Sequence, residues 1–142
     1  MEELIRKIMA ISRIMGAKNF GFFKDKGYKP IGIGQIAILR MVLDDPGLVA
    51  DDIRKALELD KATVAIAIKH LMIAGLIRRE VDEDDHRKKR LYATDKLNAA
   101  SLEIENEIRS QIKKITYGFS ERDIEEFGQY LDRIRENMSR EI

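Results

Sequence analysis

The stretch from residue 76 to residue 94 constrains the fold most, because the hydrophobic pattern changes there from helical spacing to strand-like runs. Two short β-favouring segments, LIRREV and KRLYAT, flank the charged loop DEDDHRK. This arrangement is typical of a β-hairpin with a long loop. Helical periodicity lies on both sides of it, so we predict a mainly α chain with one small β-hairpin.

Four helices are predicted before the hairpin. A long amphipathic helix covers residues 2–23, and the chain is then interrupted near Pro30. Shorter helices are predicted over 34–45, 49–59 and 61–75. Asp60 is a good N-cap for the last of them, and Gly75 suits the position that follows a helix C-terminus.

Two further helices are predicted after the hairpin. Apolar residues from Leu97 to Ile115 form a stripe at helical spacing, and Ser120 with Asp123 resembles a capping box that opens a final helix. The first and last helices are amphipathic and need a partner for their apolar faces. Pairing with the same helices of a second chain is the economical solution, and a compact monomeric bundle is the alternative. We therefore predict a dimerisation region over 1–30 and 95–142, and a winged helix-turn-helix over 31–94.

Composition excludes several classes of function. The chain has no cysteine and two histidines, which excludes disulfide scaffolds, thiolate metal sites and zinc sites built on several imidazoles. The acids at 82–85 lack the spacing of a calcium loop and are expected to be solvated. No apolar run is long enough to span a membrane and the start does not resemble a signal peptide, so we expect a cytoplasmic protein. No catalytic motif or nucleotide-binding loop is present, so we expect neither enzymatic activity nor a cofactor.

Charge is distributed unevenly, although the formal net charge is only +1. Residues 44–60 carry six acids and two bases, whereas residues 61–90 carry eight bases and five acids. Two short helices, 49–59 and 61–75, are joined by a tight turn and followed by the hairpin, which is the order of a helix-turn-helix with a wing. The basic part of the chain covers the second of these helices and the hairpin. Helix 61–75 and the hairpin are therefore the predicted DNA-binding elements, and their candidate contact residues are Lys61, Thr63, Lys69, His70, Arg78, Arg79, Arg87, Lys88, Lys89 and Arg90.

The same region resembles the multiple-antibiotic-resistance regulator (MarR) family. GQIAILRMVLDDPG is similar to the opening of the family's DNA-binding lobe, and LDKATVAIAIKHLMIAGLIRRE is similar to its recognition-helix pattern. DEDDHRKKRLYAT resembles its wing, in which an Asp and an Arg two residues apart, here Asp85 and Arg87, precede a strand that ends in Thr94. With the long flanking helices, the resemblance spans essentially the whole chain.

This resemblance implies a transcription regulator, specifically a repressor, that binds a pseudo-palindromic duplex as a homodimer. The recognition helices would lie in successive major grooves, and Arg87 of each wing would enter a flanking minor groove. A guanidinium suits a narrow, strongly negative minor groove, and Asp85 can hold it by a charge-assisted hydrogen bond. Lys88, Lys89 and Arg90 would then bind phosphates.

The sequence departs from the family just after Thr63 and Val64. Family members usually carry Ser or Thr followed by Arg there, whereas this chain has Ala65 and Ile66. Ile66 has two interpretations: contact with a thymine methyl group, or burial in the core. His70 likewise either contacts phosphate or faces water.

Two further interpretations concern partners other than DNA. The resemblance implies a cleft for a small phenolic or other aromatic acid, for which the candidate lining residues are Arg13, Phe20, Phe23 and Arg40. The rival to DNA binding is a protein-interaction module in which the apolar helix 61–75 docks a partner. The basic residues of the predicted wing also have a simpler interpretation. Arg87 and Asp85 would form an ordinary exposed ion pair, and Lys88, Lys89 and Arg90 would form a charged strand edge that discourages aggregation.

Overall fold

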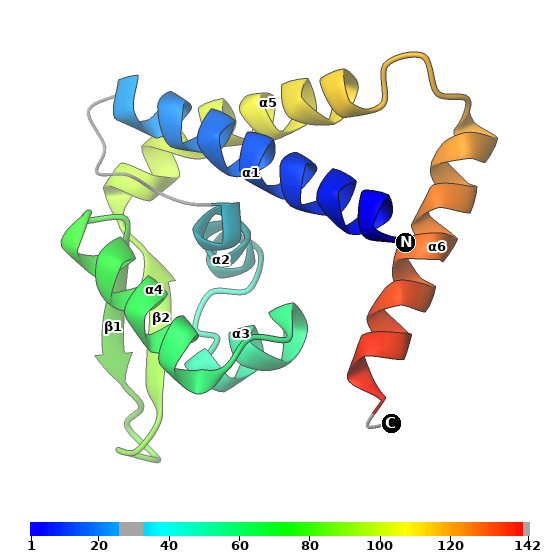
Figure 1. The fold of residues 1–142 in the computed structure, drawn as a ribbon. Helices are drawn as coiled ribbons and strands as arrows, with labels where there is room; N and C mark the ends of the chain where they lie inside the picture. Colours follow the sequence, from blue (N-terminus) through cyan, green and yellow to red (C-terminus); the bar gives the residue numbers. More distant parts are fainter. Residues whose placement is uncertain (26–32, 141–142) are drawn as a thin grey trace. The chain divides into compact units, whose positions relative to one another are not determined.

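The computed structural model describes residues 1–25 and 33–140, with side chains described for 1–15 and 34–140. Contacts divide the chain into two compact units, Met1–Ser101 and Leu102–Ile142. The described part contains six helices and one two-stranded antiparallel sheet, in agreement with the predicted fold class. Figure 1 shows their succession along the chain, and the elements are α1 (Glu2–Asp25), α2 (Ile33–Asp44), α3 (Ala50–Leu57), α4 (Lys61–Ile73), β1 (Ile77–Val81), β2 (Lys89–Ala93), α5 (Asp95–Ile115) and α6 (Glu121–Ser139).

The core of the first unit draws on every element from α2 to the start of α5. Helices α2 and α3 both contact α4 and β2, and α4 also contacts β1. Removing these apolar side chains from water is the main favourable term in folding of the unit. The largest fully buried side chains are Ile38, Leu39, Val42, Ile53, Val64, Leu71, Leu76, Leu91 and Leu97.

Helix boundaries follow the predicted capping residues closely. Asp60 caps α4 by accepting a hydrogen bond from the Thr63 amide at 2.8 Å, and Gly75 has a φ of +73° just beyond the helix. Ser120 and Asp123 form the predicted capping box at the start of α6. Each cap satisfies backbone donors that a helix N-terminus leaves unpaired.

The hairpin is fixed at its base to the turn between α2 and α3. Strands β1 and β2 pair antiparallel, with Arg79 opposite Leu91. The Leu91 amide donates to the Leu48 carbonyl at 2.9 Å, and the Gly47 amide donates to the Leu91 carbonyl at 2.8 Å. Gly47 has a φ of +91°, and a Cβ there would lie 3.2 Å from the Tyr92 hydroxyl, so both conformation and space favour glycine. Figure 1 shows the loop of the hairpin extending beyond the helices of this unit.

Each of the two units has a helix with an exposed apolar face. In the first unit, the exposed side chains of α1 include Leu4, Ile5, Ile8, Ile11 and Ile14. In the second unit, those of α6 include Ile124, Phe127, Leu131, Ile134 and Met138. Contiguous apolar surface of this kind marks an interaction site more often than free protein surface. None of the described helices is both long and apolar enough to cross a membrane.

Candidate nucleic-acid interface

Helix α4 packs one face into the core and presents the other to solvent. Val64, Ala67, Ile68 and Leu71 are buried. Ile66 is 56% exposed, so the structure excludes burial, one of its two interpretations. The predicted contact residues of this helix are all exposed, and they are Lys61, Thr63, Ala65, Ile66, Lys69 and His70.

His70 is linked to α2. The amide nitrogen of Gln35 lies 3.4 Å from His70 Nδ1, and the Gln35 Oε1 atom is buried with no partner among the described residues. An amide nitrogen can only donate, so in this arrangement Nδ1 accepts and the proton of a neutral ring is on Nε2. That proton is a suitable donor to a phosphate oxygen, and the phosphate role of His70 stays a prediction.

Asp82 organises the loop between the strands. Its Oδ1 accepts from the amides of Asp84 and Asp85, both at 2.9 Å, and its Oδ2 accepts from Arg90 Nε at 2.5 Å. The Asp85 amide and the Arg90 guanidinium, followed by the Asp84 amide, lower the pKa of Asp82 from 3.8 to about 2. The carboxylate is therefore ionised at neutral pH and fixes the path of the loop.

The loop presents Arg87 at its tip. Arg87 Nε donates to Asp85 Oδ1 at 3.2 Å, and the Arg87 amide donates to the same oxygen at 3.1 Å. The Arg87 side chain is nevertheless 92% exposed. The expected contact between Asp85 and Arg87 is thus present, and it leaves most of the guanidinium open to a ligand.

The remaining basic side chains fall into two groups. Lys88 and Lys89 are exposed. Arg90 bonds to Asp82 and donates to the Gly47 carbonyl at 2.9 Å, which ties the loop to the α2–α3 turn. Arg78 stacks 4.8 Å from the Tyr92 ring centre and bonds to Glu80. Phosphate binding by Arg78 and Arg90 stays a prediction, but both side chains already have partners within the wing.

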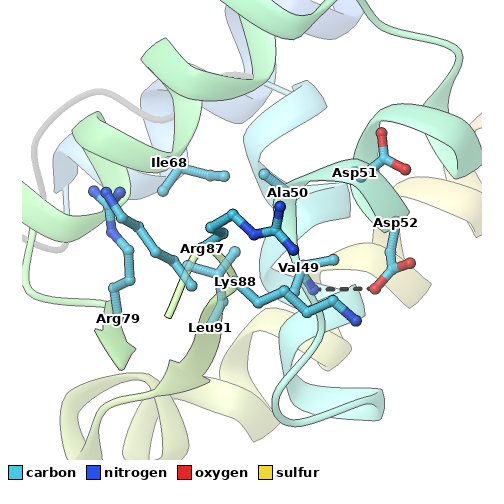
Figure 2. A pocket seen from close by; sticks show the side chains of 10 residues that line it. Val49, Ala50, Asp51, Asp52, Ile68, Arg79, Arg87, Lys88 and Leu91 are labelled. Atoms are coloured by element: carbon cyan, nitrogen blue, oxygen red, sulfur yellow. Dashed lines mark hydrogen bonds between the residues drawn. The ribbon is translucent and has the colours of Figure 1, made fainter. Parts of the chain in front are cut away.

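A cavity of about 510 Å³ is lined by residues of the hairpin, of the start of α3 and of α4. In Figure 2, the side chains of Arg87 and Lys88 lie between Arg79 and the start of α3. Arg79 also donates to the sulfur of Met72 at 3.4 Å. Four cations and two acids, Asp51 and Asp52, line this cavity, so its wall has an excess of positive charge. Such a wall suits an anionic ligand of elongated shape, for example a nucleic-acid backbone.

The predicted effector site is only partly described. The side chains of Phe20 and Phe23 lie outside the described residues. Arg13 lines a cavity of about 330 Å³ with Arg6, Met9 and Ala10, whereas Arg40 Nε bonds to Asp44 at 3.0 Å. A common pocket for these residues therefore stays a prediction. Among the residues with described side chains, no group of three acids or histidines converges as a metal site.

Two of the residues that shape the wing, Asp82 and Gly47, are not predicted from the sequence. Asp82 was grouped with solvated loop acids, whereas it receives three hydrogen bonds. The side chain of an Asp at the start of a loop often accepts hydrogen bonds from backbone amides a few residues later. The position of Asp82 at the start of the charged loop therefore indicates this role from the sequence. The contact between Arg90 and Gly47 joins residues 43 positions apart, and no local pattern indicates it.

Asp82→Asn is expected to loosen the loop at neutral pH. Because the native pKa of about 2 lies below the ordinary value of 3.8, the ionised form stabilises the folded loop fully above about pH 4, and this contribution is lost as pH falls through 2. NMR chemical shifts of the Asp84 and Asp85 amides should therefore titrate near pH 2 in the original chain and show no such step in the variant. Glu83→Gln, a neighbouring change of the same kind, should preserve the step. A midpoint near 4 in the original chain would contradict the assignment.

Comparisons with known proteins agree with this architecture. A model of the MarR family matches residues 27–88. The chain is 26% identical over 141 residues to YybA of Bacillus subtilis (strain 168), an uncharacterised HTH-type transcriptional regulator, with coverage of 99% of this chain and 92% of YybA. The transcriptional regulator SlyA, whose crystal structure is known, is 31% identical in sequence, and its structure matches with a TM-score of 0.83. The match covers 96% of this chain and 94% of SlyA. MepR of S. aureus, solved in a complex with DNA, is 22% identical in sequence and has the same fold, with a TM-score of 0.84. The match covers 96% of this chain and 98% of MepR.

Proposed function

This chain belongs to the MarR family of transcriptional regulators, and from that premise we propose that it binds duplex DNA as a homodimer and represses transcription. The observation that carries the proposal is the placement of Arg87. Its side chain is held by Asp85 in the loop of a hairpin whose base is hydrogen-bonded to the α2–α3 turn, and it is 92% exposed. An exposed ion pair of this kind contributes little to stability, so the fold itself does not explain why an arginine is placed there.

The proposed contacts use two grooves. Helix α4 would enter the major groove, since an α-helix fits its width and residues near the helix N-terminus reach base edges. Arg87 would enter the adjacent minor groove, where a guanidinium is favoured by the strong negative potential. Lys61, Lys69, Lys88 and Lys89 are exposed cations suited to the phosphates in between.

A homodimer supplies the symmetry that a palindromic site requires. The exposed apolar faces of α1 and α6 need a cover, and a second copy of the same chain provides it. Two copies of α4 would then meet half-sites about one helical turn apart, roughly 34 Å. A dimer bound across a promoter excludes other proteins from it, which is why we propose repression.

A small aromatic acid is the proposed effector. Arg13 and Arg40 are exposed, and a guanidinium is a suitable partner for a carboxylate. Addition of benzoate during a DNA titration checks this part of the proposal, because a genuine effector would shift the DNA affinity of the original chain and not that of Arg13→Ala/Arg40→Ala.

Selection from a randomised duplex library, followed by fluorescence anisotropy, tests the proposed function. We expect an enriched site with two-fold symmetry, and an affinity that falls steeply with salt because several phosphates per protomer are neutralised. A slope of log affinity against log salt of about −5 or steeper is expected for the dimer. The rival function, docking of a protein partner on α4, predicts that no duplex is enriched.

A further inference from the structure

The exposed face of α4 has an apolar centre between two cations. Ala62, Ala65 and Ile66 are all exposed, and their spacing of three and four residues places them on one face of the helix. Lys61 precedes this group and Lys69 follows it. None of the three apolar side chains has a hydrogen-bond donor or acceptor for a base edge.

The nearest hydroxyl is already committed. Thr63 Oγ1 donates its proton to Asp60 Oδ2 at 2.6 Å, and the Thr63 amide donates to the other oxygen of the same carboxylate at 2.8 Å. The hydroxyl also draws the pKa of Asp60 below 3.8, so the acceptor is ionised at neutral pH. Thr63 is therefore held as part of the helix cap, and its proton is not available to a base.

An apolar patch framed by cations fits one chemical group in the major groove. Thymine presents its C5-methyl group there, and no other unmodified base presents a carbon substituent. The cations Lys61 and Lys69, with Arg87, Lys88 and Lys89 on the wing, complement the phosphates on both sides of the groove. An apolar partner protein would leave this surrounding positive charge without a counterpart.

Resting on the proposed function, we propose that Ile66, with Ala62 and Ala65, recognises thymine by contact with its C5-methyl group. Each half-site of the operator then contains thymine under the middle of α4, and base discrimination there depends on apolar contact instead of hydrogen bonds. Because 5-methylcytosine carries its methyl group on the same ring carbon, it is expected to bind more tightly than cytosine at this position.

The test replaces single thymines of the selected operator with uracil, which pairs identically and lacks only the methyl group. For the thymine under Ile66, we expect an affinity loss of about fourfold for each methyl removed. Ile66→Ala should bind the thymine site more weakly than the original chain and should distinguish thymine from uracil less strongly, because only Ala62 and Ala65 remain to contact the methyl group. This double-mutant cycle separates the methyl contact from any effect of uracil on DNA shape.

Ile73→Ala is the matched control. Ile73 is 55% exposed, almost the same as Ile66, and lies seven residues later at the C-terminal end of the same helix. This variant should keep the full preference for thymine over uracil. Equal binding of thymine and uracil operators by the original chain, or an unchanged preference in Ile66→Ala, would overturn methyl recognition while DNA binding itself stands. Failure to enrich any duplex would instead overturn the proposed function, and methyl recognition with it.

Discussion

Arg87→Ala is expected to weaken operator binding about 100-fold, because a dimer loses one groove contact of about 1–3 kcal/mol on each wing. The fold should be unaffected, since the Arg87 side chain is 92% exposed and its pairing with Asp85 contributes little to stability. Fluorescence anisotropy at fixed salt gives the affinity, and circular dichroism checks the fold. Arg87→Lys should recover only part of the loss, because lysine keeps the charge but not the planar fork of donors.

Arg109→Ala provides the matched control for this variant. Arg109 pairs with Glu105 at 2.7 Å, its side chain is 70% exposed, and Glu105 is as exposed as Asp85. Both variants therefore remove one arginine from an exposed ion pair, but only one of them lies on the wing. If the two variants bound DNA equally well, net charge would explain the effect and the wing would have no specific role.

Leu131→Asp is expected to convert the proposed dimer into a monomer and to lower operator affinity by at least about 100-fold. Leu131 lies in the middle of the exposed apolar face of α6, and a carboxylate buried there would be unpaired. Once the two α4 helices are no longer linked, the second half-site is bound without the gain in effective concentration that linkage gives. Analytical ultracentrifugation should show a species of 16.4 kDa in place of one twice as heavy.

Gln129→Asp adds the same charge to the same helix on its opposite, polar face, and Gln129 is exposed. This variant should remain dimeric and bind the operator normally. A single-chain mass for the original protein at micromolar concentration would contradict the proposed assembly, whatever the variants do. Concentration must be held constant in all these comparisons, because dissociation depends on it.

The parts of the fold that could be predicted from sequence are those set by local chemistry. Asp60, Gly75 and the pair Ser120–Asp123 mark helix ends because each satisfies backbone groups a few residues away. The hairpin was predictable for the same reason, from two β-favouring runs around a charged loop. The order of these elements, together with the resemblance to the MarR family, then predicted the winged helix-turn-helix architecture of the chain.

The candidate site was predictable only in outline. Apolar residues surround most of the circumference of α4, so periodicity could not decide whether Ile66 faces the core or solvent. The exposed position became evident only from the packing of Val64, Ala67, Ile68 and Leu71 against the other elements. Likewise, Arg90 was predicted to bind phosphate because it is basic and follows two lysines. Its partners within the chain, Asp82 and the Gly47 carbonyl, are brought to it by tertiary structure, and its contact with phosphate stays a prediction.

The anchoring of the hairpin to the α2–α3 turn has a mechanical consequence. Backbone bonds from Leu91 to Leu48 and Gly47, and the guanidinium of Arg90 on the Gly47 carbonyl, leave the hairpin little freedom to swing against the helices. These bonds therefore restrict how far the hairpin that carries Arg87 can move relative to α4. If Arg87 and α4 contact the minor and major grooves as proposed, the number of base pairs between these two contacts is fixed within each half-site. Adjustment of the proposed dimer to a poorly spaced operator would then have to come from movement of one protomer against the other.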